Sequence, residues 1–272
     1  MPELPEVEVT KQGVAPYVLG RSLLKINIMQ EKLRWIVPRS IFNSVGFKVV
    51  DVVRRAKYIF LHFELGSIVI HLGMSGVLRL ANKDYVLKKH DHVVLTFGGD
   101  RLLVYNDPRR FGCVLWIDKH ELASHKLFSN LAPEPLSADF HADYLFSKLK
   151  HRNKTIKSCL MDQTIVVGVG NIYANEVLFE ALIHPERPGK LVLHSDCINL
   201  VIIIKKVLQE SIKAGGTTLK DFFKTDGKPG YFSNKLKIYG RREDGCVNCD
   251  GEITEKQLAG RATYFCSQCQ LS

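Results

Sequence analysis

Four cysteines near the end of the chain constrain its fold more than any other feature. Two residues separate Cys246 from Cys249, two separate Cys266 from Cys269, and sixteen lie between the pairs. Each two-residue gap lets two thiolates converge on one ion, and two such pairs complete a closed tetrahedral zinc site. A segment this short cannot bury a core of its own, so the metal replaces one. We predict one structural Zn²⁺ held by Cys246, Cys249, Cys266 and Cys269.

Disulfides, a redox pair and chance spacing remain the alternatives for these four thiols. The chain has an odd number of cysteines, seven, and its first residues lack the basic region and apolar run of a secretory signal. A reducing cytoplasm therefore fits best, and disulfides are not expected. The other thiols, which we expect in the core, are Cys113, Cys159 and Cys197.

The segment between the two cysteine pairs indicates a hairpin with a charged tip. Gly260 suits the turn, and Arg261 would then project from a loop that the metal holds rigid. A guanidinium held in this way is suited to bind phosphate. On spacing alone, a solvated surface arginine is an equal alternative.

The charge of the chain favours a polyanionic partner. Its formal net charge is +10 and its pI is near 9.2, as in proteins that bind nucleic acid. A merely basic soluble protein is the alternative. No stretch approaches the roughly 18 apolar residues that span a bilayer, so no membrane partner is expected.

The sequence pattern predicts mainly β-strands in the first half of the chain and helices in the second. We predict one helix over residues 3–19. The short β-branched runs that follow, separated by Gly, Asn and Asp, predict a β-sandwich or barrel. A Pro-rich linker at 132–137 precedes helical segments near 138–150, 154–162, 171–182 and 195–214. The predicted strands are 49–53, 58–63, 67–71, 93–97, 102–105 and 113–117.

The N-terminus carries a candidate nucleophile. A small second residue permits removal of the initiator Met, which leaves Pro2 as a secondary amine. An α-amino group has a pKa of about 8, against about 10 for lysine, so more of it is neutral and nucleophilic at neutral pH. Glu3, next to it, could shuttle protons. The alternative is structural, because both residue types also favour the start of a helix.

The opening residues 2–8, Pro-Glu-Leu-Pro-Glu-Val-Glu, resemble the start of bacterial formamidopyrimidine-DNA glycosylases. Further matching motifs run through the whole chain, at 54–58, 71–76, 89–92, 107–112, 168–173, 215–219 and 260–261, together with the four cysteines. The departures are Val9-Thr10 and Ser158-Cys159, where a Thr-Ser pair and a Pro-Trp pair are more usual; they put only local packing in doubt.

The resemblance implies an α+β fold in three parts. An N-terminal β-sandwich with a leading helix (1–132) would be followed by a helical domain with a helix–two-turn–helix motif and a lesion-covering loop (133–234). A zinc finger (235–272) would complete the chain. The loop corresponds to residues from Thr217 to Ser233. We expect a monomer that binds damaged double-stranded DNA.

The same resemblance implies a bifunctional glycosylase and lyase that excises oxidised purines. Pro2 would attack C1′ of an extruded nucleotide, and Glu3 would transfer protons. Lys57 would contact phosphate and assist proton transfer, and Arg261 would grip the phosphates and take part in δ-elimination. Successive β- and δ-elimination would leave a one-nucleotide gap.

Six further residues match DNA contacts of that family. Met74, Arg109 and Phe111 would fill the space left by the extruded base, and Arg109 would also bond the orphaned base, preferably cytosine. His90, Arg152 and Asn171 would contact phosphate. Asn171 opens a helix after a Gly-rich turn, so capping alone remains its alternative. His71 carries no assigned role.

Two rival functions remain. Enzymes of the endonuclease VIII branch, which remove oxidised pyrimidines, typically open Pro-Glu-Gly-Pro-Glu, whereas this chain has Leu4. A non-catalytic zinc-ribbon protein that binds DNA would have no need of Pro2, Glu3, Lys57 and Arg261 together. Both rivals are therefore less favoured than the purine-lesion enzyme.

Overall fold

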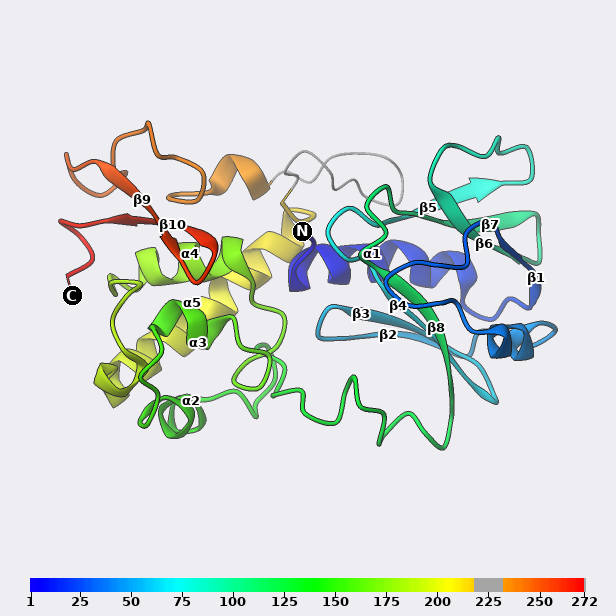
Figure 1. Ribbon diagram of the computed structural model, residues 1–272, viewed down its shortest axis with the longest axis horizontal. Coiled ribbons are helices and arrows are strands. Elements are labelled where there is room, and N and C mark those ends of the chain that lie inside the picture. Colours follow the sequence, from blue (N-terminus) through cyan, green and yellow to red (C-terminus); the bar gives the residue numbers. More distant parts are fainter. Residues whose placement is uncertain (218–231, 272) are drawn as a thin grey trace. The chain divides into compact units, whose positions relative to one another are not determined.

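The computed structural model describes residues 1–217 and 232–271 (Figure 1). They form two compact units. The first contains Met1–Ser129 and the described residues of Ile212–Ser233, and the second contains Asn130–Ser211 and the residues from Asn234 onward. The finer division with boundaries after 132 and 234 stays a prediction. Apart from Thr217 and the residues from 232, the predicted lesion-covering loop lies outside the described residues.

The first unit is built on two four-stranded antiparallel sheets, which confirms the predicted β-sandwich. One sheet has the order β1-β6-β7-β5 and the other β2-β3-β4-β8. Two of the strands, β1 and β5, lie outside the predicted runs. The strands are β1 (Leu23–Ile28), β2 (Asp51–Arg55), β3 (Tyr58–His62), β4 (Gly66–His71), β5 (Val77–Asn82), β6 (Asp91–Phe97), β7 (Arg101–Asn106) and β8 (Cys113–Asp118).

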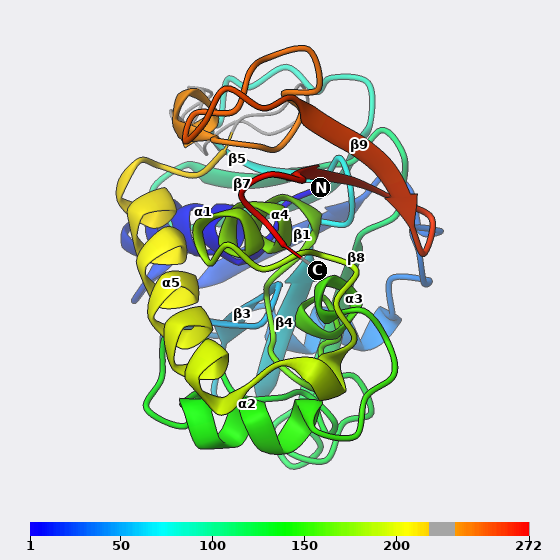
Figure 2. The same ribbon diagram turned by 90° about the vertical axis from the view of Figure 1, so that its left-hand side faces the viewer.

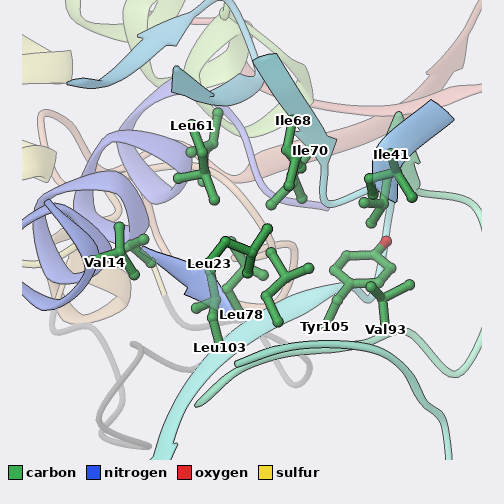
Figure 3. Packing of buried hydrophobic residues seen from close by; sticks show 14 of the residues in the cluster. Val14, Leu23, Ile41, Leu61, Ile68, Ile70, Leu78, Val93, Leu103 and Tyr105 are labelled. Carbon is green, nitrogen blue, oxygen red and sulfur yellow. The ribbon is translucent and has the colours of Figure 1, made fainter. Parts of the chain in front are cut away.

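The period-two alternation of side chains places the core between these sheets. In β3, Ile59 and Leu61 join the main core cluster, whereas Phe60 joins a smaller cluster with Val69 and Ile117 on the other face. Figure 3 shows inward side chains of β3 and β4 meeting those of β5, β6 and β7. The short η1 helix (Arg39–Ser44) contributes Ile41 to the same core.

Helix α1 (Leu4–Val18) buries one face in this core. Val7, Val14 and Val18 recur at helical spacing and are at most 1% exposed. Glu8 accepts a hydrogen bond from Arg54 Nε of β2 at 2.9 Å. Burial raises the pKa of Glu8, but Lys11 and Arg54 outweigh it and leave that pKa below its ordinary value. The helix that follows Pro2 is thus fixed to the sandwich.

The second unit is helical, as predicted, and ends in a hairpin. Its helices are α2 (Ala142–Leu149), α3 (Ile156–Leu160), α4 (Asn171–Glu180) and all but the last two residues of α5 (His194–Lys213), with the short turn η2 (Gly189–Leu191). The short turn η3 (Phe232–Lys235) spans the boundary between the two units. The hairpin pairs β9 (Ile253–Leu258) with β10 (Arg261–Cys266). Both views show β10 against α4 (Figures 1 and 2). No helix among the described residues has the length and apolar character that a membrane crossing requires.

A two-residue turn sets the register of this hairpin. Ala259 and Gly260 have φ of 48° and 72°, the pattern of the tight turn that matches the twist of paired strands. Arg261 follows at once as the first residue of β10, and its side chain is exposed. The predicted hairpin with an arginine beside its turn is confirmed.

Close packing around Gly112 yields a first prediction. A Cβ at this position would run into the Tyr105 hydroxyl and the His71 carbonyl. We expect Gly112→Ala to lower the free energy of unfolding by about 2 kcal/mol, because the well-packed neighbours must shift. Gly98→Ala is the matched control, since nothing lies within 4 Å of its Cβ. Urea denaturation measures both, and equal stabilities of the two variants would contradict the packing.

Candidate functional site

The N-terminus is held by a buried carboxylate. Pro2 is buried, and Glu3, 1% exposed, precedes the first turn of α1. The backbone N of Glu3 donates to Glu6 Oε2 at 2.8 Å, and the backbone N of Thr217 donates to Glu6 Oε1 at 2.8 Å. One side chain therefore fixes the backbone next to Pro2 and the backbone at Thr217.

Lys57 lies in the two-residue turn between β2 and β3, near His71. Burial, followed by the positive charges of Lys57 and Arg34, lowers the pKa of His71 from 6.5 to about 4, against a smaller opposite effect of Asp107. His71 Nδ1 accepts a hydrogen bond from Gly73 N at 3.0 Å. A neutral imidazole is the form that can accept this bond.

The structure brings together the turns that carry Met74, Arg109 and Phe111. Met74 follows β4 and is half-buried, whereas Phe111, before β8, is 47% exposed. Arg109 Cζ lies 5.0 Å from the centre of the Phe111 ring, a cation–π contact. Gly73 has a φ of 65°, and its missing side chain would collide with the Phe111–Gly112 backbone. The two turns thus pack backbone against backbone.

Asp107, which the sequence analysis did not single out, lies beneath both turns. Its side chain is fully buried and accepts hydrogen bonds from Ser75, Tyr105, Arg109 and Gly112. Burial, followed by the nearby Asp107, raises the pKa of Tyr105. His90, half-buried with a φ of 73°, accepts a hydrogen bond from Asp107 N at its carbonyl.

In the second unit, two side chains bind the backbone beside Arg261. Asn171 Nδ2 donates to the Ala262 carbonyl at 3.0 Å. Lys157 Nζ donates to the same carbonyl at 2.8 Å and to Thr263 Oγ1 at 2.6 Å, although Lys157 is only 2% exposed. Gly170 precedes α4 as its cap, so the side chain of Asn171 does not cap this helix.

Helix α4 also binds the chain ahead of the first cysteine pair. Glu176 accepts hydrogen bonds from the backbone N atoms of Lys237, Ile238 and Tyr239, at 2.8–3.0 Å. Burial raises the pKa of Glu176 even though these amides lower it. Arg152, by contrast, is half-buried between α2 and α3, and its carbonyl accepts a hydrogen bond from Lys190 N.

The four predicted metal ligands lie together. All four Sγ atoms are within 4.8 Å of one another. Three of the separations are 3.8 Å for Cys246–Cys269, 3.6 Å for Cys249–Cys266 and 3.4 Å for Cys249–Cys269. A tetrahedral zinc with Zn–S bonds of about 2.3 Å needs sulfur atoms about 3.8 Å apart. The donor set and its size fit zinc. The other three cysteines, Cys113, Cys159 and Cys197, are buried as predicted.

Sequence reasoning missed the buried polar residues that hold these segments: Glu6, Ser75, Asp107, Lys157 and Glu176. A single sequence does not show which polar side chains are buried. Asp107 had one local signal, since Asp before Pro often starts a turn. Lys157 and Glu176 had none, because their partners lie more than sixty positions away.

The lowered pKa of His71 predicts a specific pH dependence of stability. Because the unfolded chain binds a proton at higher pH than the folded one, stability should fall as pH falls from about 6.5 to about 4. We expect His71→Asn, which keeps an acceptor but does not titrate, to remove about 1–3 kcal/mol of that loss. Urea denaturation from pH 4.5 to 7.5 measures it, and parallel curves for both proteins would contradict a neutral His71.

Comparison with known proteins places the chain in a family. The formamidopyrimidine-DNA glycosylase N-terminal domain matches residues 1–114, and the H2TH domain of the same glycosylase matches 131–223. The formamidopyrimidine-DNA glycosylases of Shewanella amazonensis and Haemophilus influenzae are 51% and 46% identical to it over 270 residues, 99% of each chain.

Solved structures agree with the sequence comparison. A Lactococcus lactis FPG mutant in complex with Fapy-dG containing DNA superposes with a TM-score of 0.93 at 32% identity, over 100% of both chains. The Lactococcus lactis Fpg with an abasic site containing DNA gives 0.92 at 33% identity, over 99% of this chain and 100% of that one. The chain described here therefore belongs to the formamidopyrimidine-DNA glycosylase family.

Proposed function

We propose that this protein is a bifunctional DNA glycosylase and abasic-site lyase of base-excision repair. It excises oxidised purines, 8-oxoguanine and formamidopyrimidines, from duplex DNA and then cleaves the strand. The observation that carries the proposal is Pro2 at the buried start of α1, beside Glu3, whose backbone N is fixed by Glu6. Family membership over the whole chain and the DNA complexes of the Lactococcus lactis proteins support it.

Pro2 is the nucleophile once the initiator Met has been removed. Its nitrogen bonds to C1′ of the damaged nucleotide while the C1′–base bond breaks and the base leaves with a proton. After the sugar ring opens, the secondary amine forms an iminium that is necessarily cationic. This charge acidifies the C2′–H bond, so loss of that proton expels the 3′ phosphate by β-elimination. A second elimination expels the 5′ phosphate and leaves a one-nucleotide gap.

Three side chains assist these steps. Glu3 donates and accepts protons during base release and ring opening. Lys57 contacts phosphate and assists proton transfer from its turn beside neutral His71. Arg261 binds the phosphates around the lesion and promotes δ-elimination, at a position held by the bonds of Lys157 and Asn171 to Ala262.

Duplex DNA is the proposed ligand, and the net charge of +10 suits it. His90, Arg152 and Asn171 contact its phosphates. The side-chain amide of Asn171 bonds the Ala262 carbonyl with one of its two N–H groups, and the backbone at the start of α4 offers further donors to phosphate. Met74, Arg109 and Phe111 fill the gap left by the extruded base. The protein acts as a monomer.

One Zn²⁺ completes the second unit. Cys246, Cys249, Cys266 and Cys269 supply four thiolates and leave no open coordination position, so the ion is structural. When bound, it fixes the β9–β10 hairpin on which Arg261 lies. The cysteines pack against a small core of Phe179, Ile238 and Ile253, which alone is too small to order the hairpin.

The first experiment tests whether the protein prefers oxidised purines or the rival class, oxidised pyrimidines. We expect cleavage of a duplex with 8-oxoguanine opposite cytosine to exceed that of a thymine glycol duplex by about tenfold or more, since these two classes need different pockets. Preferred cleavage of thymine glycol would assign the protein to oxidised pyrimidines. Binding of both duplexes with no cleavage would instead indicate a DNA-binding protein without catalysis.

The nucleophile is tested by blocking one atom. A short tag placed before Pro2 turns its amine into an amide, which cannot form an iminium; the same tag after Ser272 is the control. We expect the N-terminally tagged protein to lose more than about 1000-fold in strand cleavage and to give no adduct with lesion DNA on borohydride reduction. Parental cleavage by that protein would exclude Pro2 as nucleophile.

The metal site is tested by stoichiometry. Metal analysis of the purified protein should find one zinc per chain, and Cys249→Ser should lose it, because three thiolates bind zinc more weakly than four. Cys159→Ser, at a buried thiol outside the cluster, should keep it. We also expect Cys249→Ser to melt about 5 °C or more below the parent. Full zinc content in Cys249→Ser would contradict the assignment.

A further inference from the structure

We infer that Asp107 is the positioning residue for the gap-filling side chains, so that one buried carboxylate sets the place of all three. This inference rests on the proposed function, because it assumes that Met74, Arg109 and Phe111 enter the duplex. Asp107 itself, 0% exposed, does not reach DNA. It acts through the turns that carry these residues.

Each carboxylate oxygen serves a different pair of donors. Oδ1 accepts hydrogen bonds from Ser75 Oγ at 2.7 Å and from Arg109 N at 3.3 Å. Oδ2 accepts hydrogen bonds from Gly112 N at 2.9 Å and from the Tyr105 hydroxyl at 3.2 Å. The bonds to Arg109 and Gly112 bracket the exposed Phe111 from both sides. Phe111 is thus held by its neighbours' amides.

Ser75 joins the second turn to the first. It follows Met74, is 8% exposed and also accepts a hydrogen bond from Arg109 N at 3.2 Å. Its hydroxyl therefore lies between the carboxylate and the Arg109 backbone. A displacement of Asp107 would move the turn with Met74 and the turn with Phe111 together.

The backbone of Asp107 anchors the carboxylate to a third segment. Its N donates to the His90 carbonyl at 3.1 Å, and its carbonyl bonds His92 Nε2 at 2.8 Å. Because a carbonyl only accepts, His92 Nε2 carries the proton of this bond. The strand ends of β6 and β7 thus give Asp107 a rigid base, which a wedge into stacked bases needs.

The experiment compares a duplex substrate, in which the extruded base leaves a space in the stack, with a single-stranded substrate, in which it does not. Asp107→Asn keeps the side-chain shape but replaces one acceptor oxygen with a donor. We expect kcat/KM on a duplex with 8-oxoguanine opposite cytosine to fall about 100-fold, because a small displacement of groups that position the substrate lowers the rate by about that factor. A single-stranded oligonucleotide with a preformed abasic site has no duplex base stack in which a space must be filled, so kcat/KM on this substrate should change by no more than about threefold. The preference for cytosine over adenine opposite the lesion should fall with it.

Two further variants keep the inference testable if Asp107→Asn folds poorly. Ser75→Ala removes only the link between the turns, and we expect about a tenfold loss on the duplex alone. Asp100→Asn makes the same chemical change at an exposed turn, where the Asp100 carboxylate pairs with Lys83. We expect it to leave kcat/KM on both substrates unchanged. Equal losses on both substrates in Ser75→Ala or Asp107→Asn would indicate a structural role and overturn the inference.

Arg109→Ala separates this inference from the function on which it rests. If Arg109→Ala cleaves the lesion duplex at the parental rate, the gap-filling role fails. If Arg109→Ala loses duplex activity while a folded Asp107→Asn and Ser75→Ala retain it, the role stands and the positioning by Asp107 is wrong. Duplex-specific loss in all three supports both.

Discussion

Buried carboxylates that accept hydrogen bonds from loop amides hold the functional segments of this protein in place. Glu6 binds the amides of Glu3 and Thr217, Asp107 those of Arg109 and Gly112, and Glu176 those of residues 237–239. A loop amide has no neighbouring strand to pair with, and leaving it buried and unpaired costs about 1–3 kcal/mol. A carboxylate has two oxygens and can satisfy several amides at once.

Each of these carboxylates lies in a helix or directly after a strand, while the amides belong to irregular segments. Glu6 lies in α1, Asp107 directly follows β7, and Glu176 lies in α4. The sandwich and the helices therefore supply the stiffness, and the residues proposed to act on DNA lie at the ends of these elements and in the loops between them. The hairpin of the second unit has a different support. There the cluster of four cysteines lies in the same unit as Lys157 and Asn171, which bind the backbone next to Arg261.

The sequence predicted the parts of the fold that depend on local patterns. Alternating strands, the leading helix, the four later helices and the paired cysteines were found because periodicity and spacing are local signals. Strands β1 and β5 were missed; β1 carries exposed Leu24 and Lys25 in succession, which breaks the alternation. The cap of α4 was placed one residue late. The candidate site residues came from motifs. Some of the residues that position them bond across long sequence separations, as Lys157 does to Thr263, and no local pattern marks such pairs.

Amide hydrogen exchange in the free protein tests most directly whether a buried carboxylate fixes these loops. The amides of Arg109 and Gly112 lie outside the sheets, so without Asp107 nothing in the sandwich ladder would protect them. We predict that both exchange about 100-fold or more slowly than an unstructured chain, and that Asp107→Asn, which keeps only one acceptor oxygen, lowers this protection while strand β7 keeps its own. Exchange of these two amides at unstructured rates in the parent protein would contradict the account.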